Sequence, residues 1–507
     1  MKIKIKNKII ISAFILTIAG LLTRVLGFVH RIFMTNIIGA EGIGLYQLVF
    51  PIYSLAWAIT CAGFTTAVSK LAAAAKAKRE YEKMKSFMVY AVLITGLLAV
   101  ILSMGLFFSA ELIANYIFNE PRIALGLKTL SFAIPFMAMG SSLRGYFFGI
   151  QEAKIPAISQ IIEQIMRMFL IYVLSRVYFG SIETAVALAV AGIAAGEVVS
   201  FLYVFFAYKD KYGTKANTER TAKKHFRKSR NKDSYNKRKV DKAVLTTLLA
   251  MSVPLGLSRI SGSLLSTVEN ILIPSRLELY GIENAVEEFG KLTGMAMPLI
   301  QFPSAVLMAL SISLVPAISE ASELKNYNQI NEAVKKTMLF SMVIGIGAAA
   351  GFILFGDTIG KLIYSYDLSH ILKPIGFLVP FIYANMLLMG ILNGLGLQGF
   401  IFKNSLVYSI ISIAGVYFLI PRIGILGYII AIGVGSVLLF CLNLNKIHKI
   451  ANLKIDFLNW AIKPLFAVFI AAGVLGFVEG FILRVLVFGV VYLGMVYGFL
   501  KNQLQLR

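Results

Sequence analysis

Long apolar runs, separated by short polar segments, recur along almost the whole chain. Most are about 20 residues or longer, which is the length that a helix needs to cross the hydrocarbon core of a bilayer. A transmembrane barrel would instead show ~10-residue stretches of alternating apolar and polar positions. The pattern predicts an all-α polytopic membrane protein with about 14 spans, at residues 9–37, 43–69, 86–110, 124–150, 155–178, 184–208, 243–275, 289–318, 334–356, 372–398, 403–420, 423–444, 457–478 and 480–500.

The composition and the placement of charge support this fold class and suggest an orientation. Of the 507 residues, 58% are hydrophobic and 15% are charged, and the mean hydropathy is +0.79. Soluble domains contain about 25% charged residues. Lysine and arginine, which give the net charge of +24, cluster at the N-terminus and in loops that follow even-numbered spans. Because cytoplasmic loops are enriched in these residues, we expect both termini in the cytoplasm and no nucleic-acid partner.

The two halves of the chain resemble each other weakly, on either side of a basic linker at 209–242. Corresponding short motifs keep their order along both halves: LRG at 143–145 and LNG at 392–394, Lys154 and Lys403, VHRI at 29–32 and VENI at 268–271, Ser69 and Ser319. This predicts a parallel repeat of two six-helix lobes around a central cavity. The lobes would comprise residues 1–208 and 243–447, and residues 448–507 would add two further helices.

Several arginines lie within predicted spans, where a central charge costs roughly 2.5–3.5 kcal/mol on insertion. Such residues usually face a bundle interior, water or a bound ligand. Arg24 and Arg31, seven residues apart, share one face of the first span. The other intramembrane arginines are Arg144, Arg167 and Arg259. Since they outnumber the acids among them, we expect a cationic cavity, and the planar guanidinium group suits phosphate in particular.

Three further polar residues are candidates for lining the cavity or for coupling transport to an ion. Glu163 precedes Arg167 by four residues, so the two side chains can pair on one helix, either structurally or functionally. Glu269 and Asn270 lie in the span that contains Arg259. The four histidines show no metal-ligand spacing, and we find no nucleophile triad. We therefore expect a transporter and no enzyme, with no cofactor beyond a coupling Na⁺ or H⁺ ion.

The segments TRVLGFVHR at 23–31 and IIGAEGIGLYQL at 37–48 resemble the stage V sporulation protein B group. This group is a polysaccharide-transporter branch of the multidrug/oligosaccharidyl-lipid/polysaccharide exporter superfamily. TTAVSKL at 65–71 and IPSRL at 273–277 are also similar, and the resemblance extends over essentially the whole chain. It implies a two-lobed alternating-access transporter, whose relatives flip undecaprenyl-linked sugars that include lipid II. The lipid II flippase branch has Arg-Asp where this chain has His30-Arg31.

The resemblance thus implies a flippase in the bacterial cell membrane for a polyprenyl-pyrophosphate-linked saccharide, favouring a peptidoglycan precursor for the spore cortex. Arg24, Arg31 and Arg259 would bind the pyrophosphate and sugar, with Arg144 and Arg167 also in the site. The implied partners are the lipid-linked saccharide, membrane lipids and cell-wall synthases. The alternatives are a cation-coupled multidrug exporter of the same superfamily, a flippase for another surface polysaccharide, and a scaffold that transports nothing. A site for cationic drugs favours acids and aromatics over arginines.

Overall fold

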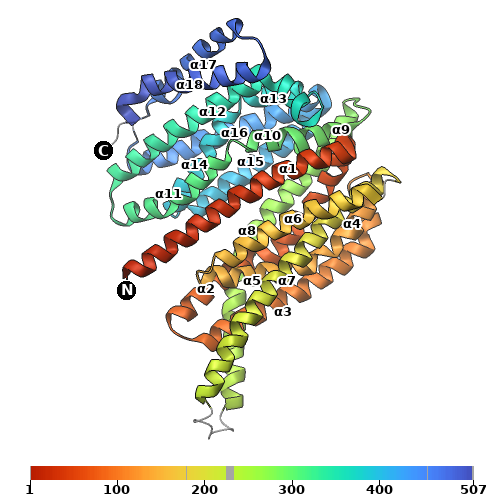
Figure 1. The fold of residues 1–507 in the computed structure, drawn as a ribbon, viewed down its shortest axis with the longest axis vertical. Coiled ribbons are helices and arrows are strands. Elements are labelled where there is room, and N and C mark those ends of the chain that lie inside the picture. The colour runs from red at the N-terminus through yellow and green to blue at the C-terminus, as the bar shows by residue number, and fades with distance from the viewer. Residues whose placement is uncertain (1, 178–179, 224–232, 454, 505–507) are drawn as a thin grey trace. The chain divides into compact units, whose positions relative to one another are not determined.

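The computed structural model describes residues 2–177, 180–223, 233–453 and 455–504, and these ranges consist of helices and the short turns that connect them, without a strand. The chain forms two compact units, Met1–Ile271 and Leu272–Arg507 (Figure 1). The first contains α1 to most of α8, and the second contains the remaining helices. Each unit has its own hydrophobic core of buried aliphatic and aromatic side chains. The predicted fold class, an all-α membrane protein, is confirmed.

Unit 1 consists of long helices joined by short turns. Its helices are α1 (Lys2–Trp57), α2 (Gly63–Ala77), α3 (Tyr81–Leu112), α4 (Ala124–Ser131), α5 (Ala133–Gly149), α6 (Lys154–Val177), α7 (Ile182–Lys223) and α8 (Asp233–Leu279). A π-helical turn, Ala58–Ala62, joins α1 to α2. Helices α7 and α8 extend into the predicted linker at 209–242, of which residues 224–232 lie outside the described residues. The predicted lobe boundaries at 208 and 243 remain a prediction.

Helix α1 is bent in its second half, at the motif IGAEG. Gly39 has φ 69° and ψ −177°, a conformation that costs glycine little because it has no Cβ. Next to the bend, the Arg122 guanidinium donates a hydrogen bond to Glu41 Oε1 at 2.6 Å. It also donates to both carboxylate oxygens of Glu120, each at 2.7 Å. Bidentate arginine–carboxylate pairs are among the stronger polar contacts. The bend is thus fixed to the segment that leads into α4.

Unit 2 repeats the pattern of long helices and adds two at the C-terminus. Its helices are α9 (Ala285–Gly290), α10 (Met297–Gln301), α11 (Ala305–Glu323), α12 (Tyr327–Tyr364), α13 (Ser369–Gly376), α14 (Val379–Gly394), α15 (Gln398–Ile423), α16 (Ile425–Ala451), α17 (Lys463–Val474) and α18 (Phe481–Leu504). Helices α17 and α18 lie side by side against α12 (Figure 1). Tyr492 of α18 donates a hydrogen bond to the Val343 carbonyl of α12 at 2.7 Å. The C-terminal pair therefore shares the core of unit 2.

The two units contain the same interhelical contact at corresponding positions. In unit 1 the Cys61 thiol lies 3.9 Å from the Met137 carbonyl oxygen. In unit 2 the Ser311 hydroxyl donates to the Met386 carbonyl at 2.9 Å. Each contact joins residues about 75 positions apart in the sequence. The contacting residues occupy corresponding places in the two halves, in the same order as the repeated motifs.

The glycines of the repeated motifs LRG and LNG occupy equivalent packing positions. A Cβ on Gly145 of α5 would lie 2.6 Å from the Thr65 carbonyl oxygen of α2. A Cβ on Gly394 of α14 would lie 2.9 Å from the Val315 carbonyl oxygen of α11. Helix α5 thus packs on α2 as α14 packs on α11, with no room for a side chain at either glycine.

In the described part of the chain, ten helices are long and apolar enough to cross a membrane, or up to twelve if each of two bent pairs crosses as one span. The predicted count of 14 is not confirmed. One helical stretch, Ile18–Ala77, which is bent at Gly39, contains most of the predicted span 9–37 and all of the predicted span 43–69. At 1.5 Å per residue it is about 90 Å long, roughly three times the hydrocarbon thickness, so two crossings fit within it. Helix α6, predicted as a span, is absent from the ten.

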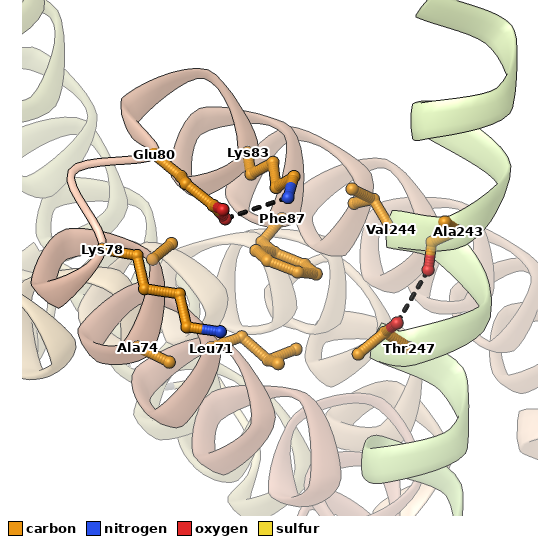
Figure 2. Close-up of a pocket in the computed structure, with 10 residues that line it drawn as sticks. Leu71, Ala74, Lys78, Glu80, Lys83, Phe87, Ala243, Val244 and Thr247 are labelled. Atoms are coloured by element: carbon orange, nitrogen blue, oxygen red, sulfur yellow. Dashed lines mark hydrogen bonds and ion pairs between the residues drawn. The ribbon is translucent and has the colours of Figure 1, made fainter. Parts of the chain in front are cut away.

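A pocket of about 470 Å³ opens at one end of unit 1 (Figure 2). The end of α2 and the beginning of α3 form one wall, and Ala243, Val244 and Thr247 of α8 form the other. Its lining residues are Leu71, Ala74, Ala75, Lys78, Glu80, Lys83, Phe87, Ala243, Val244 and Thr247. The basic α2–α3 connection places this pocket at the predicted cytoplasmic end of the helices.

Candidate functional site

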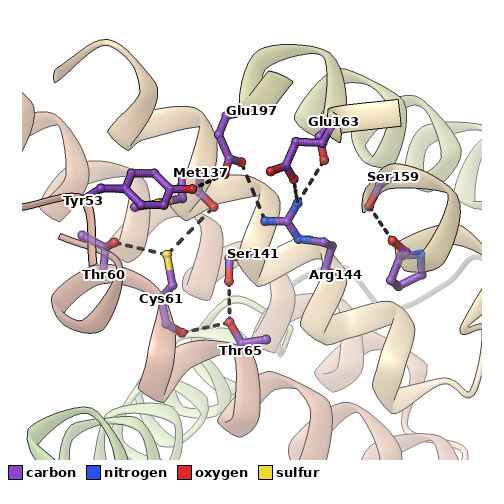
Figure 3. Close-up of polar contacts among 12 residues, drawn as sticks. Tyr53, Thr60, Cys61, Thr65, Met137, Ser141, Arg144, Ser159, Glu163 and Glu197 are labelled. Carbon is purple, nitrogen blue, oxygen red and sulfur yellow. Dashed lines mark hydrogen bonds and ion pairs between the residues drawn. The ribbon is translucent and has the colours of Figure 1, made fainter. Parts of the chain in front are cut away.

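Arg144 is the centre of a polar network inside unit 1 (Figure 3). Its side chain extends from α5 towards two carboxylates on neighbouring helices: Glu163 Oε2 of α6 lies 3.7 Å away and Glu197 Oε2 of α7 lies 3.9 Å away. The same guanidinium donates a 3.0 Å hydrogen bond to Ser200 Oγ of α7. One arginine therefore connects three helices, and its side chain is only 12% exposed.

A second arginine completes the network from within α6. Arg167 Nη2 donates to Glu163 Oε1 at 2.9 Å, across one helical turn. The sequence predicted this pair from the four-residue spacing, and the structure confirms it. Glu163 thus accepts from Arg167 with one oxygen and faces Arg144 with the other. Its side chain is 17% exposed, so both arginines compensate a largely buried carboxylate.

Helix α1 contributes a tyrosine to the same network. The Tyr53 hydroxyl donates to Glu197 Oε1 at 2.5 Å, while the other oxygen of Glu197 faces Arg144. The Glu197 side chain is only 4% exposed. A buried carboxylate is tolerated when a cation and hydrogen-bond donors compensate it, and Glu197 has both.

The network contains equal numbers of cations and anions, Arg144 and Arg167 against Glu163 and Glu197. The sequence analysis did not include Glu197 and Tyr53 among its candidates, and the predicted excess of arginine, which also counts Arg24, Arg31 and Arg259, stays a prediction. Glu197 had a signal, since it is the one acidic residue well inside the apolar run 184–208. Nothing in the sequence distinguished Tyr53 as a functional residue, because aromatic residues are common in membrane spans. Whether Arg144 and Arg167 contact a substrate remains a prediction.

Helix α1 carries two of the predicted site arginines, Arg24 and Arg31. Arg24 and Arg31 are both half-buried, and both make polar or electrostatic contacts. His30, between them in sequence, is 4% exposed, and neither ring nitrogen has a hydrogen-bond partner among the described residues. A buried imidazole without a partner is uncommon, because a lost hydrogen bond is costly. This stretch of α1 is therefore polar and incompletely satisfied.

The candidates on α8 lie beside α1 rather than in the network. Ser263 Oγ lies 3.2 Å from Ser54 Oγ, so this part of α8 packs on α1 within unit 1. Arg259 is exposed, Glu269 is half-buried, and both are placed on α8 at the predicted positions. Asn270 donates to the Ser266 carbonyl of its own helix at 2.7 Å. The structure therefore brings Arg144, Glu163 and Arg167 together, and it leaves the roles of the α8 residues as predictions.

In unit 2 the helices that correspond to α5, α6 and α7 contain a chain of amides. Asn404 of α15 donates to Asn443 of α16 at 3.2 Å, and Asn443 donates to Asn385 of α14 at 3.1 Å. Asn385 donates in turn to the Ser436 carbonyl at 2.8 Å. All three asparagines are buried. The repeat thus joins three helices with charges in one unit and with neutral amides in the other.

A further arginine was missed as a candidate, although its motif IPSRL was noticed. The Arg276 guanidinium carbon lies 3.9 Å from the centre of the Tyr417 ring, a cation–π contact in unit 2.

Among the described residues no group of three or more His, Cys, Asp or Glu side chains can hold a metal ion.

Comparison with known proteins places these features in a family. Residues 10–322 match the family of polysaccharide biosynthesis proteins. Stage V sporulation protein B of Bacillus subtilis (strain 168) is 32% identical over 492 residues, which cover 96% of this chain and 91% of that protein. The lipid II flippase MurJ of the same organism is 23% identical over 384 residues, covering 72% of this chain and 67% of that protein.

A solved structure has the same fold. It is an inward-facing multidrug resistance transporter of the MATE family, in the MOP superfamily. The match has a TM-score of 0.64 and 15% sequence identity, and it covers 85% of this chain and 96% of the other. The predicted resemblance to the stage V sporulation protein B group, and with it the transporter fold, is confirmed.

Proposed function

Because the chain belongs to the polysaccharide biosynthesis protein family, we propose that it flips a polyprenyl-pyrophosphate-linked saccharide across the bacterial cell membrane. The observation that carries the proposal is the similarity to stage V sporulation protein B, which extends over 96% of the chain. The similarity to a lipid II flippase adds a relative with a named lipid-linked substrate. The intramembrane arginines supply a chemical reason, since guanidinium groups bind phosphate bidentately.

In this mechanism the headgroup binds to the intramembrane arginines while the polyprenyl tail stays in lipid. Arg24 and Arg31 of α1, together with Arg259 of α8, bind the pyrophosphate and the first sugar. Arg144 and Arg167 stay predicted members of the site, and their pairs with carboxylates also hold together the helices that pack on α1. Alternation of the lobes, coupled to Na⁺ or H⁺, then exposes the site to the opposite side.

A more specific proposal concerns the identity of the saccharide that is transported. A peptidoglycan precursor for the spore cortex is the substrate we favour, because the relative that covers almost the whole chain is named as a sporulation protein. Cell-wall synthases that consume the flipped precursor would then be the functional partners. Both termini lie in the cytoplasm in this proposal, as the distribution of lysine and arginine suggests.

The test is flipping in proteoliposomes that contain the purified full-length protein and a fluorescent lipid-linked saccharide. Lipid II is compared with an undecaprenyl pyrophosphate that carries an unrelated sugar. We expect the dithionite-accessible fraction of lipid II to rise with protein content and with an imposed Na⁺ or H⁺ gradient. Flipping of the unrelated saccharide alone would favour export of another surface polysaccharide.

A multidrug exporter is the second candidate, because a solved transporter with the same fold is described as one. The same vesicles would show this activity as gradient-driven movement of a cationic dye. Transport of the dye without flipping of any lipid-linked saccharide would overturn the flippase proposal. We expect no dye transport, since the arginines of α1 and α8 repel a cation.

A further inference from the structure

The pocket in Figure 2 combines a wall of apolar side chains with an uneven set of charges. Glu80 and Lys83 form an ion pair at 3.0 Å, on the α2–α3 side of the pocket. Lys78, on the same side, is exposed and has no ion-pair partner among the described residues. One positive charge in the pocket is therefore left without a counter-charge in the described part of the chain.

We propose that this pocket binds the phosphate headgroup of an anionic phospholipid, with Lys78 as the principal ligand. Lysine binds phosphate as a point charge, and basic pockets between membrane helices at the cytoplasmic side are suited to lipid headgroups. The volume of about 470 Å³ lies within the range of small-molecule sites, roughly 300–1,000 Å³. The inference is independent of the substrate proposed above.

The charge balance favours a phospholipid over the pyrophosphate of a polyprenyl carrier. Lys78 and Lys83 against Glu80 give a net charge of one, which matches the single negative charge of a phosphodiester. A pyrophosphate carries more charge and would require further cations. The apolar wall, Leu71 and Phe87 with Val244 opposite, fits the glycerol and first methylenes of an acyl chain.

A lipid in this position would connect two parts of unit 1. Lys78 belongs to the α2–α3 connection and Lys83 to the first turn of α3, whereas Ala243, Val244 and Thr247 belong to α8 (Figure 2). The headgroup would contact the first part and the acyl chains the second. The bound lipid would therefore act as a ligand that holds residues 243–247 of α8 against α2 and α3.

The experiment is native mass spectrometry of the full-length protein in detergent, titrated with dioleoyl phosphatidylglycerol or with phosphatidylcholine of the same chain length. We expect phosphatidylglycerol to bind more tightly than phosphatidylcholine. Lys78→Ala should weaken phosphatidylglycerol binding about fivefold, the effect of one lysine near an anionic lipid surface. Lys85→Ala is the matched control, because Lys85 is an exposed lysine of α3 that does not line the pocket.

A second variant tests the cavity without changing charge. Ala74→Leu places a larger side chain in the pocket, so it should reduce phosphatidylglycerol binding as strongly as Lys78→Ala does. Equal losses for Lys78→Ala and Lys85→Ala, or unchanged binding to Ala74→Leu, would overturn the proposal in favour of diffuse surface attraction. Displacement of phosphatidylglycerol by equimolar undecaprenyl pyrophosphate would instead make the pocket a substrate subsite and would also overturn it.

Discussion

Arg24 is the residue on which the proposed transport depends most directly. Replacing it by alanine should slow flipping by roughly 10- to 100-fold, the loss expected when a charge-assisted hydrogen bond of about 1.5–3 kcal/mol is removed. Arg24→Lys keeps the charge but loses the bidentate geometry, so its rate should lie between those of alanine and wild type. Flipping in proteoliposomes, normalised to reconstituted protein, measures all three rates.

The control for Arg24 is an arginine outside the proposed site. Arg484 of α18 is exposed and donates its Nε hydrogen to the Val478 carbonyl at 2.7 Å. Arg484→Ala should flip substrate as fast as wild type. A wild-type rate for Arg24→Ala would show that the first span does not bind the pyrophosphate.

The buried network should be more sensitive to the loss of a charge than to the loss of a hydroxyl. Arg144→Met leaves Glu197 buried without its cation, which should cost about 3 kcal/mol of unfolding free energy. Tyr53→Phe removes one hydrogen bond to the same carboxylate and should cost about 1 kcal/mol. The buried thiol of Cys61 reports unfolding to a thiol-reactive dye when exposed Cys441 is replaced by serine. Equal shifts in melting temperature for the two variants would contradict this ranking.

Single residues show where sequence could predict the site and where it could not. The Glu163–Arg167 pair was predictable because both side chains lie on one helix, four residues apart. The contact between Arg144 and Glu197 depends on how α5 packs on α7, which no local spacing encodes. Arg259 lies in the middle of a predicted span, which suggested a buried side chain. The position along a helix does not determine which helix face packs against neighbours, and the Arg259 side chain is exposed.

At the scale of elements, α9 and α13 are joined by a charged contact outside the long helices. Glu288 Oε1 lies 2.5 Å from His370 Nε2, and Lys291 lies close to both Glu288 and Glu287. Burial raises the pKa of Glu288, but the hydrogen bond and charge of His370 and the charge of Lys291 lower it more. The net pKa is therefore below the ordinary value of 4.5.

This lowered pKa predicts a pH-dependent contribution to stability. The folded state binds fewer protons at Glu288 than the unfolded state does, so the contribution is fully present above about pH 4.5 and is lost as the pH falls below it. Melting temperatures of wild type and Glu288→Gln should differ most above pH 4.5 and converge at lower pH. Exposed Glu278, replaced by glutamine, serves as the control. A constant difference across this window would exclude Glu288 as the titrating group.

The existence of most elements was predictable from apolar run length, but their continuity was not. The predicted span 124–150 is two helices bent by 44° at Phe132, and 372–398 contains a 58° bend between α13 and α14. The run 289–318 divides into a π-helical turn, α10 and α11, with Pro298 and Pro303 in the interrupted part. Hydropathy averages over these breaks because the residues on both sides are equally apolar.

For the whole molecule, the orientation in the membrane is the property to test first. Helix α12 has 38 residues, about 57 Å of helix, so its ends lie on opposite sides of a ~30 Å core. In a Cys441→Ser background, Asp367→Cys should react with an impermeant maleimide in intact cells. Leu324→Cys, at the other end, should react only after permeabilisation. The reverse pattern would place both termini outside.

A second feature of the whole molecule is that its two units contain different polar networks at corresponding helices. Corresponding helices are joined by arginines and glutamates in unit 1 and by buried asparagines in unit 2. Comparison of the two halves of the sequence revealed that LRG corresponds to LNG, so that Arg144 corresponds to Asn393. It did not reveal the chain of amides that joins α14, α15 and α16. A repeat can thus conserve backbone packing while its polar chemistry diverges.

The network of unit 1 also constrains how the protein is made. Arg144 is synthesised before Glu163 and Glu197, so α5 leaves the ribosome before either of its acidic partners exists. Alone in lipid, that arginine would cost roughly 2.5–3.5 kcal/mol. We therefore expect α5 to remain beside the translocon until α6 and α7 emerge, and the three helices to enter the bilayer as a group. Nascent chains truncated before residue 197 should consequently integrate α5 less efficiently than longer ones.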